Sequence, residues 1–358
     1  MPAFLWPAAL YAVILGLHLA LPARWVDGYV VDSKTGNPLR YRLNGLYVLV
    51  VTVAAWALAC RSGLFAWDAL YVHRYESLAG AFALGLLFTA AIVLPAAPVT
   101  GRSLLADLYL GRLENPQWQG GRVDAKMYLY LAGAVMLELN VLSFTAHHLA
   151  LYSNDPSLGV LAYAALFTFF VTEYLYFEEV HLYTYDFMAE RVGFKLGWGC
   201  LVFYPYFYCV GLWPVAALPN PHMPPALLVL LVLMFFSGWT FARGANLQKF
   251  WFKRDPYAKA FGVLDPRPLG DGKKFVITGG FWGLSRHVNY LGEILMATAL
   301  ALVLGYPAML APWLYPLYYV ALLVPRQHAD DARCAARYGP LWDEYCRRVP
   351  YRIIPYIY

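Results

Sequence analysis

The segment MYLYLAGAVMLELNVLSFTAHHLAL, residues 127–151, is an apolar run that carries a single charged residue, Glu138. A run of about 20 apolar residues is long enough to cross a lipid bilayer as a helix. The whole chain of 358 residues is 61% hydrophobic and only 14% charged, whereas soluble proteins carry about 25% charged residues. The composition therefore excludes a soluble globular protein and predicts a polytopic membrane protein.

Similar apolar runs recur along the chain. The first has no basic residue before it, so we interpret it as a span rather than a cleaved signal peptide. The segment 180–198 mixes aromatic and charged residues and could add a tenth span. We therefore predict an all-α fold with nine to ten transmembrane helices. The nine expected spans are Phe4–Leu21, Leu43–Cys60, Leu78–Ala97, Met127–Leu151, Leu158–Phe177, Gly199–Ala217, Pro225–Phe241 and two within Leu291–Val324, separated by a turn at Gly305–Pro307.

The basic residues are distributed very unevenly between the loops. If the nine spans alternate, 25 of the 27 Lys and Arg residues lie on one side, and only Arg61 and Arg74 lie on the other. Because Lys and Arg favour the cytoplasmic side, we expect the C-terminal third to face the cytoplasm. The net charge of +5 is then a topology signal, and no nucleic-acid partner is implied. The Ala- and Arg-rich composition favours a bacterial inner membrane, although the endoplasmic reticulum would give the same pattern.

Cysteine and histidine spacing indicates no metal site. None of the five cysteines has CxxC spacing, so neither a zinc site nor a disulfide framework is predicted. His147 and His148 are adjacent and lack the spaced histidines of a membrane di-iron enzyme.

Three polar clusters interrupt or follow the last spans. The first, residues 238–256, closes the seventh span with Lys, Arg, Asn and Gln side chains. A basic collar at a helix end would explain Lys and Arg alone, but the amides also suit a phosphate-bearing ligand. The second cluster precedes the helix expected from Leu291, where backbone amides favour anions. The third, residues 325–358, is rich in charged and aromatic residues, which suggests an ordered, docked segment.

These clusters resemble the signature stretches of the sterol reductases, the Δ14/Δ7/Δ24(28) family that includes the lamin B receptor. The resemblance is carried by FARGANLQKFWFKRDP (241–256), FWGLSRHVNYLGEIL (281–295) and DDARCAARYGPLWDEYCRRVPYRIIPYIY (330–358). Weaker matches are LRYRLNG (39–45), DLYLGRLENP (107–116) and FEEVHLYTYDFMAERVGFKLGWG (177–199). The resemblance implies one membrane domain, 1–358, in which helices of 1–241 form much of a sterol pocket and 242–358 bind NADPH.

The resemblance also implies the residues of the cofactor site. Lys249, Lys253 and Arg254 are our choice for the 2′-phosphate, Arg286 or Arg326 for the pyrophosphate, and Tyr338 and Trp342 for ring stacking. The expected cofactor-binding residues are Asn246, Lys249, Lys253, Arg254, Trp282, Arg286, His287, Asn289, Tyr290, Arg326, Tyr338, Trp342, Tyr345 and Arg352.

The implied reaction needs an acid. An unactivated alkene accepts no hydride until a proton has converted it to a carbocation, so a carboxyl held neutral by burial is expected near the substrate. Asp330 and Asp331 follow Arg326 at helical spacing, so a structural Arg–Asp pair is an equally good interpretation. Ranked first are Asp330, Asp331 and Tyr208, then Glu179; Glu138, Glu173, Glu178 and Asp186 are further candidates.

The substrate assignment stays open at this stage. RGAN (243–246) favours a Δ14 reductase, while Phe281, where Δ14 enzymes usually carry Trp, favours the Δ7 type. Cys200, Phe203 and Gly211 depart from the family's usual residues, so another steroid or isoprenoid alkene is a further alternative. Two other classes remain: a membrane methyltransferase of the isoprenylcysteine type, for which Lys249–Arg254 would have no phosphate to bind, and a non-catalytic sterol-binding protein.

Overall fold

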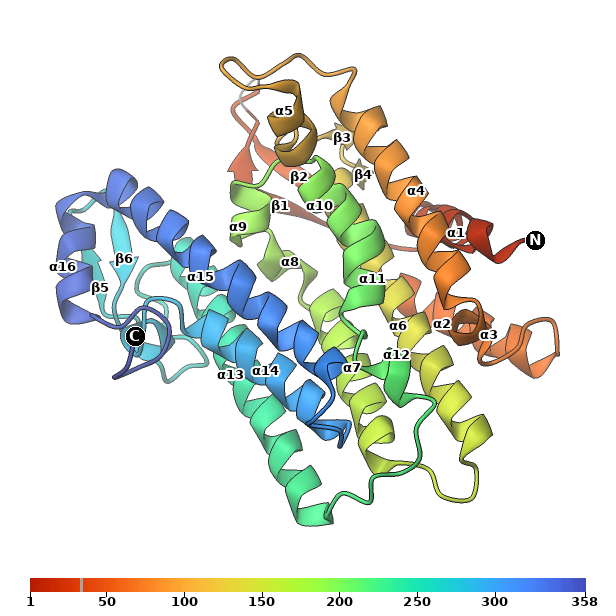
Figure 1. Cartoon of the computed structure of the whole chain (residues 1–358). Coiled ribbons are helices and arrows are strands. Elements are labelled where there is room, and N and C mark those ends of the chain that lie inside the picture. The colour runs from red at the N-terminus through yellow and green to blue at the C-terminus, as the bar shows by residue number, and fades with distance from the viewer. Residues whose placement is uncertain (33–34) are drawn as a thin grey trace. The chain divides into compact units, whose positions relative to one another are not determined.

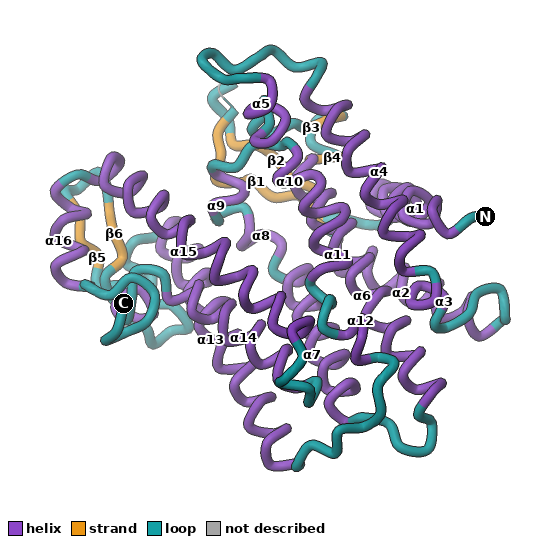
Figure 2. Tube along the Cα trace, in the orientation of Figure 1, coloured by secondary structure: helices purple, strands orange, loops and turns teal. Residues whose placement is uncertain are grey.

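The computed structural model describes residues 1–32 and 35–358, and these are mostly helical, with three two-stranded antiparallel ribbons. Figures 1 and 2 show long helices joined by short helices and loops. The chain divides into two compact units, Met1–Pro221 and His222–Tyr358. Residues 241 and 242, where the expected functional halves meet, lie within a helix of the second unit.

The first unit contains five of the six helical segments in the described residues that are long and apolar enough to cross a membrane. They are Ala3–Ala20 (with α1, Trp6–Ala20), α4 (Arg74–Val93), α6 (Ala125–Leu151), α7 (Leu158–Tyr176) and Phe194–Val215. The helix α2 (Gly45–Arg61) is apolar but shorter. These confirm a polytopic helical membrane protein, and each coincides with an expected span.

The helix α6 forms the centre of the first unit. In its most apolar stretch 83% of the residues are buried, whereas the share is 22% in the corresponding stretch of α13 (Pro225–Arg254). Gly133 lets the backbone at Cys200 approach, because a Cβ at Gly133 would lie 2.4 Å from the Cys200 carbonyl oxygen. The π-helical turn Gly199–Phe203 therefore packs directly on α6.

The segment 180–198 is not one continuous helix. It contains α8 (Glu178–His181), α9 (Tyr185–Met188) and α10 (Phe194–Trp198), and only α10 continues into the span Phe194–Val215. That span also includes the π-helical turn, α11 (Tyr204–Phe207) and α12 (Leu212–Val215). The span expected at Gly199–Ala217 thus begins five residues earlier.

Two β-ribbons and two short helices connect the long helices of the first unit. The strands β1 (Arg24–Val31) and β2 (Pro38–Leu43) pair in register from Arg24 opposite Leu43, and β3 (Gln117–Trp118) pairs with β4 (Val123–Asp124). The helix α3 (Ala69–Val72) precedes α4, and α5 (Leu104–Leu110) follows it. The buried carboxylate of Asp107 accepts a hydrogen bond from Arg112 Nε at 2.7 Å, and Arg112 also donates to the Ala96 carbonyl at 2.7 Å. The motif DLYLGRLENP therefore fastens the loop after α4.

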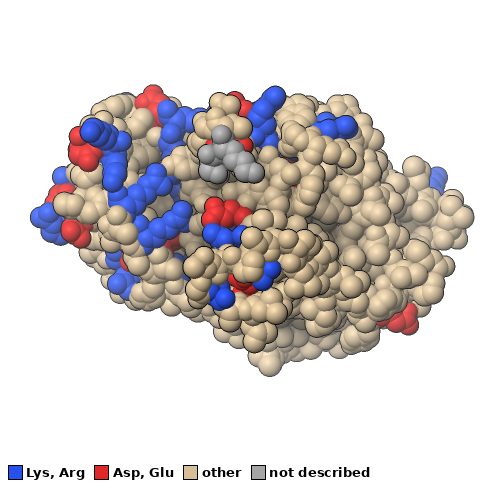
Figure 3. All heavy atoms as spheres, turned by 90° about the horizontal axis from the view of Figure 1, so that it is seen from above, with Lys and Arg blue, Asp and Glu red and all other residues tan. Residues whose placement is uncertain are grey.

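The second unit joins membrane helices to a polar region. It contains α13 (Pro225–Arg254), β5 (Pro268–Gly270), β6 (Phe275–Ile277), α14 (Val288–Val303), α15 (Leu310–Tyr338) and α16 (Pro340–Arg348). The two helices expected within Leu291–Val324 are present as α14 and the start of α15, and Gly305 lies in the turn between them with a φ of 80°. Charged side chains are unevenly spread, and Figure 3 shows Lys and Arg gathered in places between wide areas without charge.

Candidate functional site

The C-terminal segment is fastened to the residues that precede α14. The backbone N–H of Arg286 donates to the Tyr351 carbonyl at 2.9 Å, and that of His287 donates to the Arg352 carbonyl at 2.8 Å. The hydroxyl of Ser285 donates to the Ile353 carbonyl at 2.8 Å. The tail is therefore an ordered part of the second unit, and it brings Arg352 beside Arg286 and His287.

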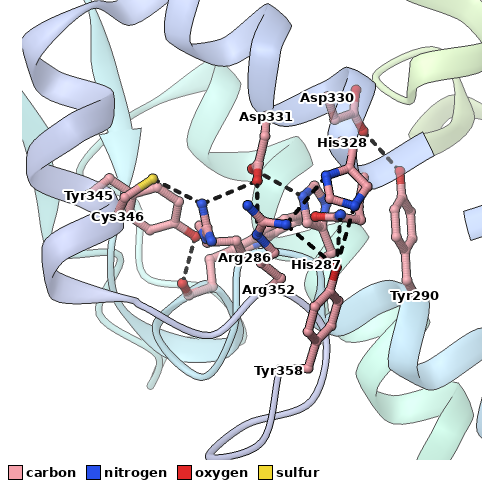
Figure 4. A network of polar contacts seen from close by, with 12 residues as sticks. Arg286, His287, Tyr290, His328, Asp330, Asp331, Tyr345, Cys346, Arg352 and Tyr358 are labelled. Carbon is pink, nitrogen blue, oxygen red and sulfur yellow. Dashed lines mark hydrogen bonds and ion pairs between the residues drawn. The ribbon is translucent and has the colours of Figure 1, made fainter. Parts of the chain in front are cut away.

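Asp331 of α15 lies at the centre of this cluster (Figure 4). Its carboxylate is 3.2 Å from Arg286 Nη1, 3.5 Å from His287 Nε2 and 3.7 Å from Arg352 Nε. Burial alone would raise the pKa of Asp331, but its interactions with His287, Arg286 and Arg352 outweigh burial and lower the pKa below the usual value. The favoured form of Asp331 is thus the charged carboxylate, which holds three cationic or polar groups together.

Asp330 points to a different partner. The hydroxyl of Tyr290 donates to Asp330 Oδ2 at 2.9 Å, and the Tyr290 ring stacks on the His287 ring with centroids 5.0 Å apart. Adjacent residues on a helix differ by about 100° in direction, which explains why Asp330 and Asp331 have separate partners. The expected Asp330–Asp331 pair therefore acts as two groups, each paired with a different part of the α14 start.

Three further expected cofactor residues are buried aromatic side chains. Tyr345 is 2% exposed and donates its hydroxyl to the Trp282 carbonyl at 2.9 Å, while Trp282 Nε1 donates to the Ala245 carbonyl at 2.9 Å. Trp342 is also buried, and Tyr338 stacks on it at 6.5 Å. The described contacts of Trp282, Trp342 and Tyr345 thus lie mainly within the protein core.

The remaining expected cofactor residues lie on α13, α14 and α15 of the same unit. Lys249 Nζ is 5.8 Å from the Trp282 ring centroid, which links the end of α13 to the η3 turn (Gly280–Gly283). The guanidinium of Arg254 covers the Phe250 ring at 4.1 Å. Asn246 and Lys253 also lie on α13, Asn289 on α14 and Arg326 on α15.

The two remaining catalytic candidates belong to the first unit. Glu179 of α8 forms an ion pair with Arg24 of β1 at 2.7 Å. The ring of Tyr208 lies edge-on to Tyr204, with centroids 4.6 Å apart, and its carbonyl accepts a hydrogen bond from Tyr163 at 3.4 Å.

Several residues of the cluster were not among the expected site residues. Tyr358 and His328 lie within 3.5 Å of one another, and both lie within 3.5 Å of Arg352. Cys346 Sγ is 3.0 Å from Arg286 Nη1. His328 precedes Asp331 by three residues, a helical spacing that could have pointed to it, whereas Cys346 and Tyr358 come from distant segments that only the docked tail brings in.

Four polar atoms of the cluster lack a hydrogen-bond partner among the described residues: Arg286 Nε, His287 Nε2, Asn289 Oδ1 and Asp331 Oδ1. His287 Nε2 and Asp331 Oδ1 lie 3.5 Å from each other. Buried polar groups in native proteins are nearly always satisfied, so unsatisfied donors and acceptors indicate a ligand or water. The Arg286 Nε donor and the Asn289 Oδ1 acceptor are of the types that a ligand with anionic and hydrogen-bonding groups requires. Among the described residues, no group of three His, Cys, Asp or Glu is arranged to hold a metal ion.

Comparison with known proteins places these features in context. A model of the ergosterol biosynthesis ERG4/ERG24 family matches residues 3–358. The chain is 31% identical to a Delta(14)-sterol reductase of Arabidopsis thaliana, over 94% of this chain and 91% of the relative. It is 34% identical to a Delta(14)-sterol reductase of Mus musculus, over 99% and 86% respectively. A Delta(14)-sterol reductase of Methylotuvimicrobium alcaliphilum is 30% identical over 99% of this chain and 84% of its own length.

Proposed function

Because the chain belongs to the ergosterol biosynthesis ERG4/ERG24 family, we propose that it reduces a ring double bond of a sterol, most favourably the Δ14 bond, with NADPH as the reductant. The relatives in three kingdoms of life that match nearly its whole length are named Delta(14)-sterol reductases. The observation that carries the proposal within the molecule is the cluster around Asp331, where a charged Arg286 and an amide from Asn289 retain unsatisfied buried atoms.

The cofactor would be held by residues from three helices. The 2′-phosphate would be bound by the basic residues at the end of α13, which are Lys249, Lys253 and Arg254. Cationic side chains form strong, charge-assisted hydrogen bonds with phosphate oxygens. Arg286 or Arg326 would bind the pyrophosphate. The remaining contacts fall to Asn246, Trp282, His287, Asn289, Tyr290, Tyr338, Trp342, Tyr345 and Arg352, either directly or through their packing. Bound NADPH supplies the hydride.

The protein must supply a proton as well as hold the cofactor. Asp331 is an unfavourable donor because its pKa is lowered, so we assign it to positioning Arg286 and His287. Asp330, which accepts a hydrogen bond from Tyr290, is a better proton donor or relay of the pair. Tyr208 and Glu179 remain further candidates, and Glu179 is the weaker because it is already engaged by Arg24.

We propose a topology in which nine helices cross the membrane and the C-terminus is cytoplasmic. The support is the one-sided distribution of Lys and Arg in the sequence. In this arrangement the helices of residues 1–241 form much of the sterol pocket, and residues 242–358 present the cofactor from the cytoplasm. The bacterial inner membrane remains our favoured location.

The residue that favoured a Δ7 enzyme has a structural explanation. The ring of Phe281 packs against Gly244, whose Cβ, if present, would lie 2.5 Å from the ring. Phe281 N–H also donates to Gln248 Oε1 at 3.0 Å. Its size is therefore matched to its neighbours on α13, which gives Phe281 a packing role in either type of reductase.

The test is a matched pair of substrates. The purified protein is incubated with NADPH and either an 8,14-diene or a 5,7-diene sterol, and the products are analysed by mass spectrometry. Reduction of the 8,14-diene alone is the expected result. Reduction of the 5,7-diene alone would establish the Δ7 alternative, and failure to bind NADPH would refute the reductase proposal.

A further inference from the structure

A small cavity lies where α6 begins and α7 ends. Its walls include Tyr130 and Leu131 of α6, Leu175 of α7, and Glu178 and His181 of α8. The space is sufficient for about one water molecule, and the carboxyl and imidazole provide polar partners for it. The cavity therefore combines apolar walls with two groups that can exchange a proton with water.

Glu178 is suited to exchange a proton near neutral pH. It is 7% exposed, and its Oε2 accepts a hydrogen bond from the backbone N–H of Gly45 at 3.0 Å. Burial raises the pKa of Glu178 to about 7, against the smaller lowering effects of the Gly45 N–H and Arg24. The titratable and charged groups around it are Tyr130 of α6, Tyr174 of α7, His181 of α8, and Arg24 of β1, which is paired with Glu179.

Tyr174 and His181 complete the polar end of this cavity. Their rings stack with centroids 3.9 Å apart, and His181 Nε2 lies 3.1 Å from the Tyr174 carbonyl oxygen. The imidazole is thereby fixed in orientation beside Glu178. The Glu178 end of the cavity is consequently a preorganised polar site rather than a chance gap in the packing.

A second buried carboxyl lies deeper along the same pair of helices. Glu138 is 2% exposed and follows Leu131 of the cavity wall by seven residues, which places it on the same face of α6 about 10 Å further along. Glu138 Oε1 accepts a hydrogen bond from Thr168 at 2.7 Å, and Thr168 precedes Leu175 of the cavity wall by seven residues on α7. The cavity and the Glu138–Thr168 pair therefore lie on one seam between α6 and α7.

Glu138 has a free acceptor position in this seam. Its Oε2 is buried without a hydrogen-bond partner among the described residues. Ionisable side chains within membrane helices are rare and commonly mark proton relays or ligand sites. A carboxyl with one oxygen bonded and the other open can receive a proton on one side and release it again.

We propose that Glu178 and Glu138 are two successive proton-holding residues of a path that runs along the α6–α7 seam and supplies the proton consumed in the reduction. The proposal rests on the proposed function, because alkene reduction takes up one proton and one hydride per turnover. Hydronium at the cavity gives a proton to the Glu178 carboxylate and becomes water; the Glu178 O–H bond then breaks as water in the seam accepts that proton and passes one of its own to the Glu138 carboxylate. Glu138 releases it toward the alkene, whose π electrons form the new C–H bond, and the cation is discharged by the hydride.

The variants Glu178→Gln and Glu138→Gln test the path, with Glu76→Gln, an exposed glutamate of α4 that pairs with His73, as the control. Glutamine is close in shape to the neutral acid, and its amide oxygen can still accept a hydrogen bond from the Gly45 N–H or from Thr168. Both variants should therefore keep the wild-type fold, which thermal unfolding checks. We expect each variant to lower kcat about a hundredfold, the low end for a lost acid–base group, while the affinity for NADPH stays the same. Glu178→Gln should also remove the fall in kcat as the pH rises through about 7. Glu76→Gln should change neither kcat nor its pH dependence.

An infrared measurement tests the same residues without turnover. The C=O stretch of protonated carboxyl groups is recorded for the whole protein in lipid nanodiscs across the neutral pH range. We expect a band that disappears with rising pH and is missing in Glu178→Gln, and a second band that is missing in Glu138→Gln. Absence of both bands, or wild-type kcat and pH dependence in both variants, would overturn the proposal. If the wild type reduces no sterol diene, the proposed function fails by itself, while the infrared bands still decide whether the two residues hold protons.

Discussion

The contact between α13 and α14 gives the sharpest stability prediction. A Cβ at Gly292 would lie 2.4 Å from both the Ala242 backbone nitrogen and the Gly238 carbonyl oxygen. Ordinary van der Waals contact begins near 3.4 Å, so Gly292→Ala forces the two helix backbones about 1 Å apart. The contacting atoms belong to backbone and cannot rotate away, as a flexible side chain could.

The size of the effect follows from two opposing terms. Overpacking of a close contact costs roughly 1–3 kcal/mol, and a gap of about 1 Å forfeits up to half of the attraction between neighbouring atoms. Against this, alanine stabilises a helix interior by about 1 kcal/mol relative to glycine. Because both clashes are with backbone, we expect the upper part of the range, a net loss of about 2 kcal/mol, which for a chain of 358 residues corresponds to a fall of roughly 3 °C in the unfolding midpoint.

The assay is thermal unfolding of the purified protein in detergent, with Gly16→Ala as the control. Gly16 lies within α1 and has nothing within 4 Å of the position that its Cβ would occupy, so this variant should be neutral or slightly stabilising. A Gly292→Ala protein that unfolds at or above the wild-type temperature would show that α13 and α14 do not pack as described.

Three further predictions concern charged residues. Lys249→Ala with Arg254→Ala should weaken NADPH binding about tenfold or more while leaving NADH binding nearly unchanged, because only NADPH has the 2′-phosphate; equal losses in a titration with both nucleotides would contradict the assignment. Asp331→Asn should destabilise the protein by roughly 2–3 kcal/mol at neutral pH; since the folded-state pKa of Asp331 is lowered, the difference from wild type should shrink as the pH falls below about 4, and a pH-independent difference in unfolding midpoint would argue against it. Lys126→Met should destabilise by roughly 2–4 kcal/mol, because Lys126 is fully buried and donates to the carbonyls of Asp186 and Phe187 at 2.9 and 3.2 Å; an unchanged midpoint in thermal unfolding would show these bonds to be dispensable.

The membrane helices could be predicted because their signal is local. Length and apolar composition are properties of a continuous segment, and they located α4, α6 and α7 to within a few residues. The segment 180–198 could not be predicted in the same way. Its short helices are held by partners from elsewhere, such as the bonds from Lys126 to the carbonyls of Asp186 and Phe187.

The polar clusters were visible in the sequence, but their internal arrangement was not. Periodicity placed Asp330 and Asp331 near Arg326, whereas the contacts recorded for Asp331 are with Arg286, His287 and Arg352. Those partners come from two distant segments that meet through backbone bonds between 286–287 and 351–352. No spacing rule within one helix contains that information.

Burial distinguishes adjacent residues that the sequence treats alike. Glu178 and Glu179 are neighbours of the same chemical type at the end of a span, and the sequence alone favoured Glu179 as an acid. In the structure Glu179 forms an ion pair with Arg24, while Glu178 is buried and accepts a hydrogen bond from the Gly45 N–H. A residue that must bind and release protons near neutral pH needs weak stabilisation of its charge, and Glu178, whose pKa burial raises to about 7, meets that condition. Asp331 and Asp330 also differ in their partners, because Asp331 contacts Arg286, His287 and Arg352, whereas Asp330 accepts a hydrogen bond from Tyr290.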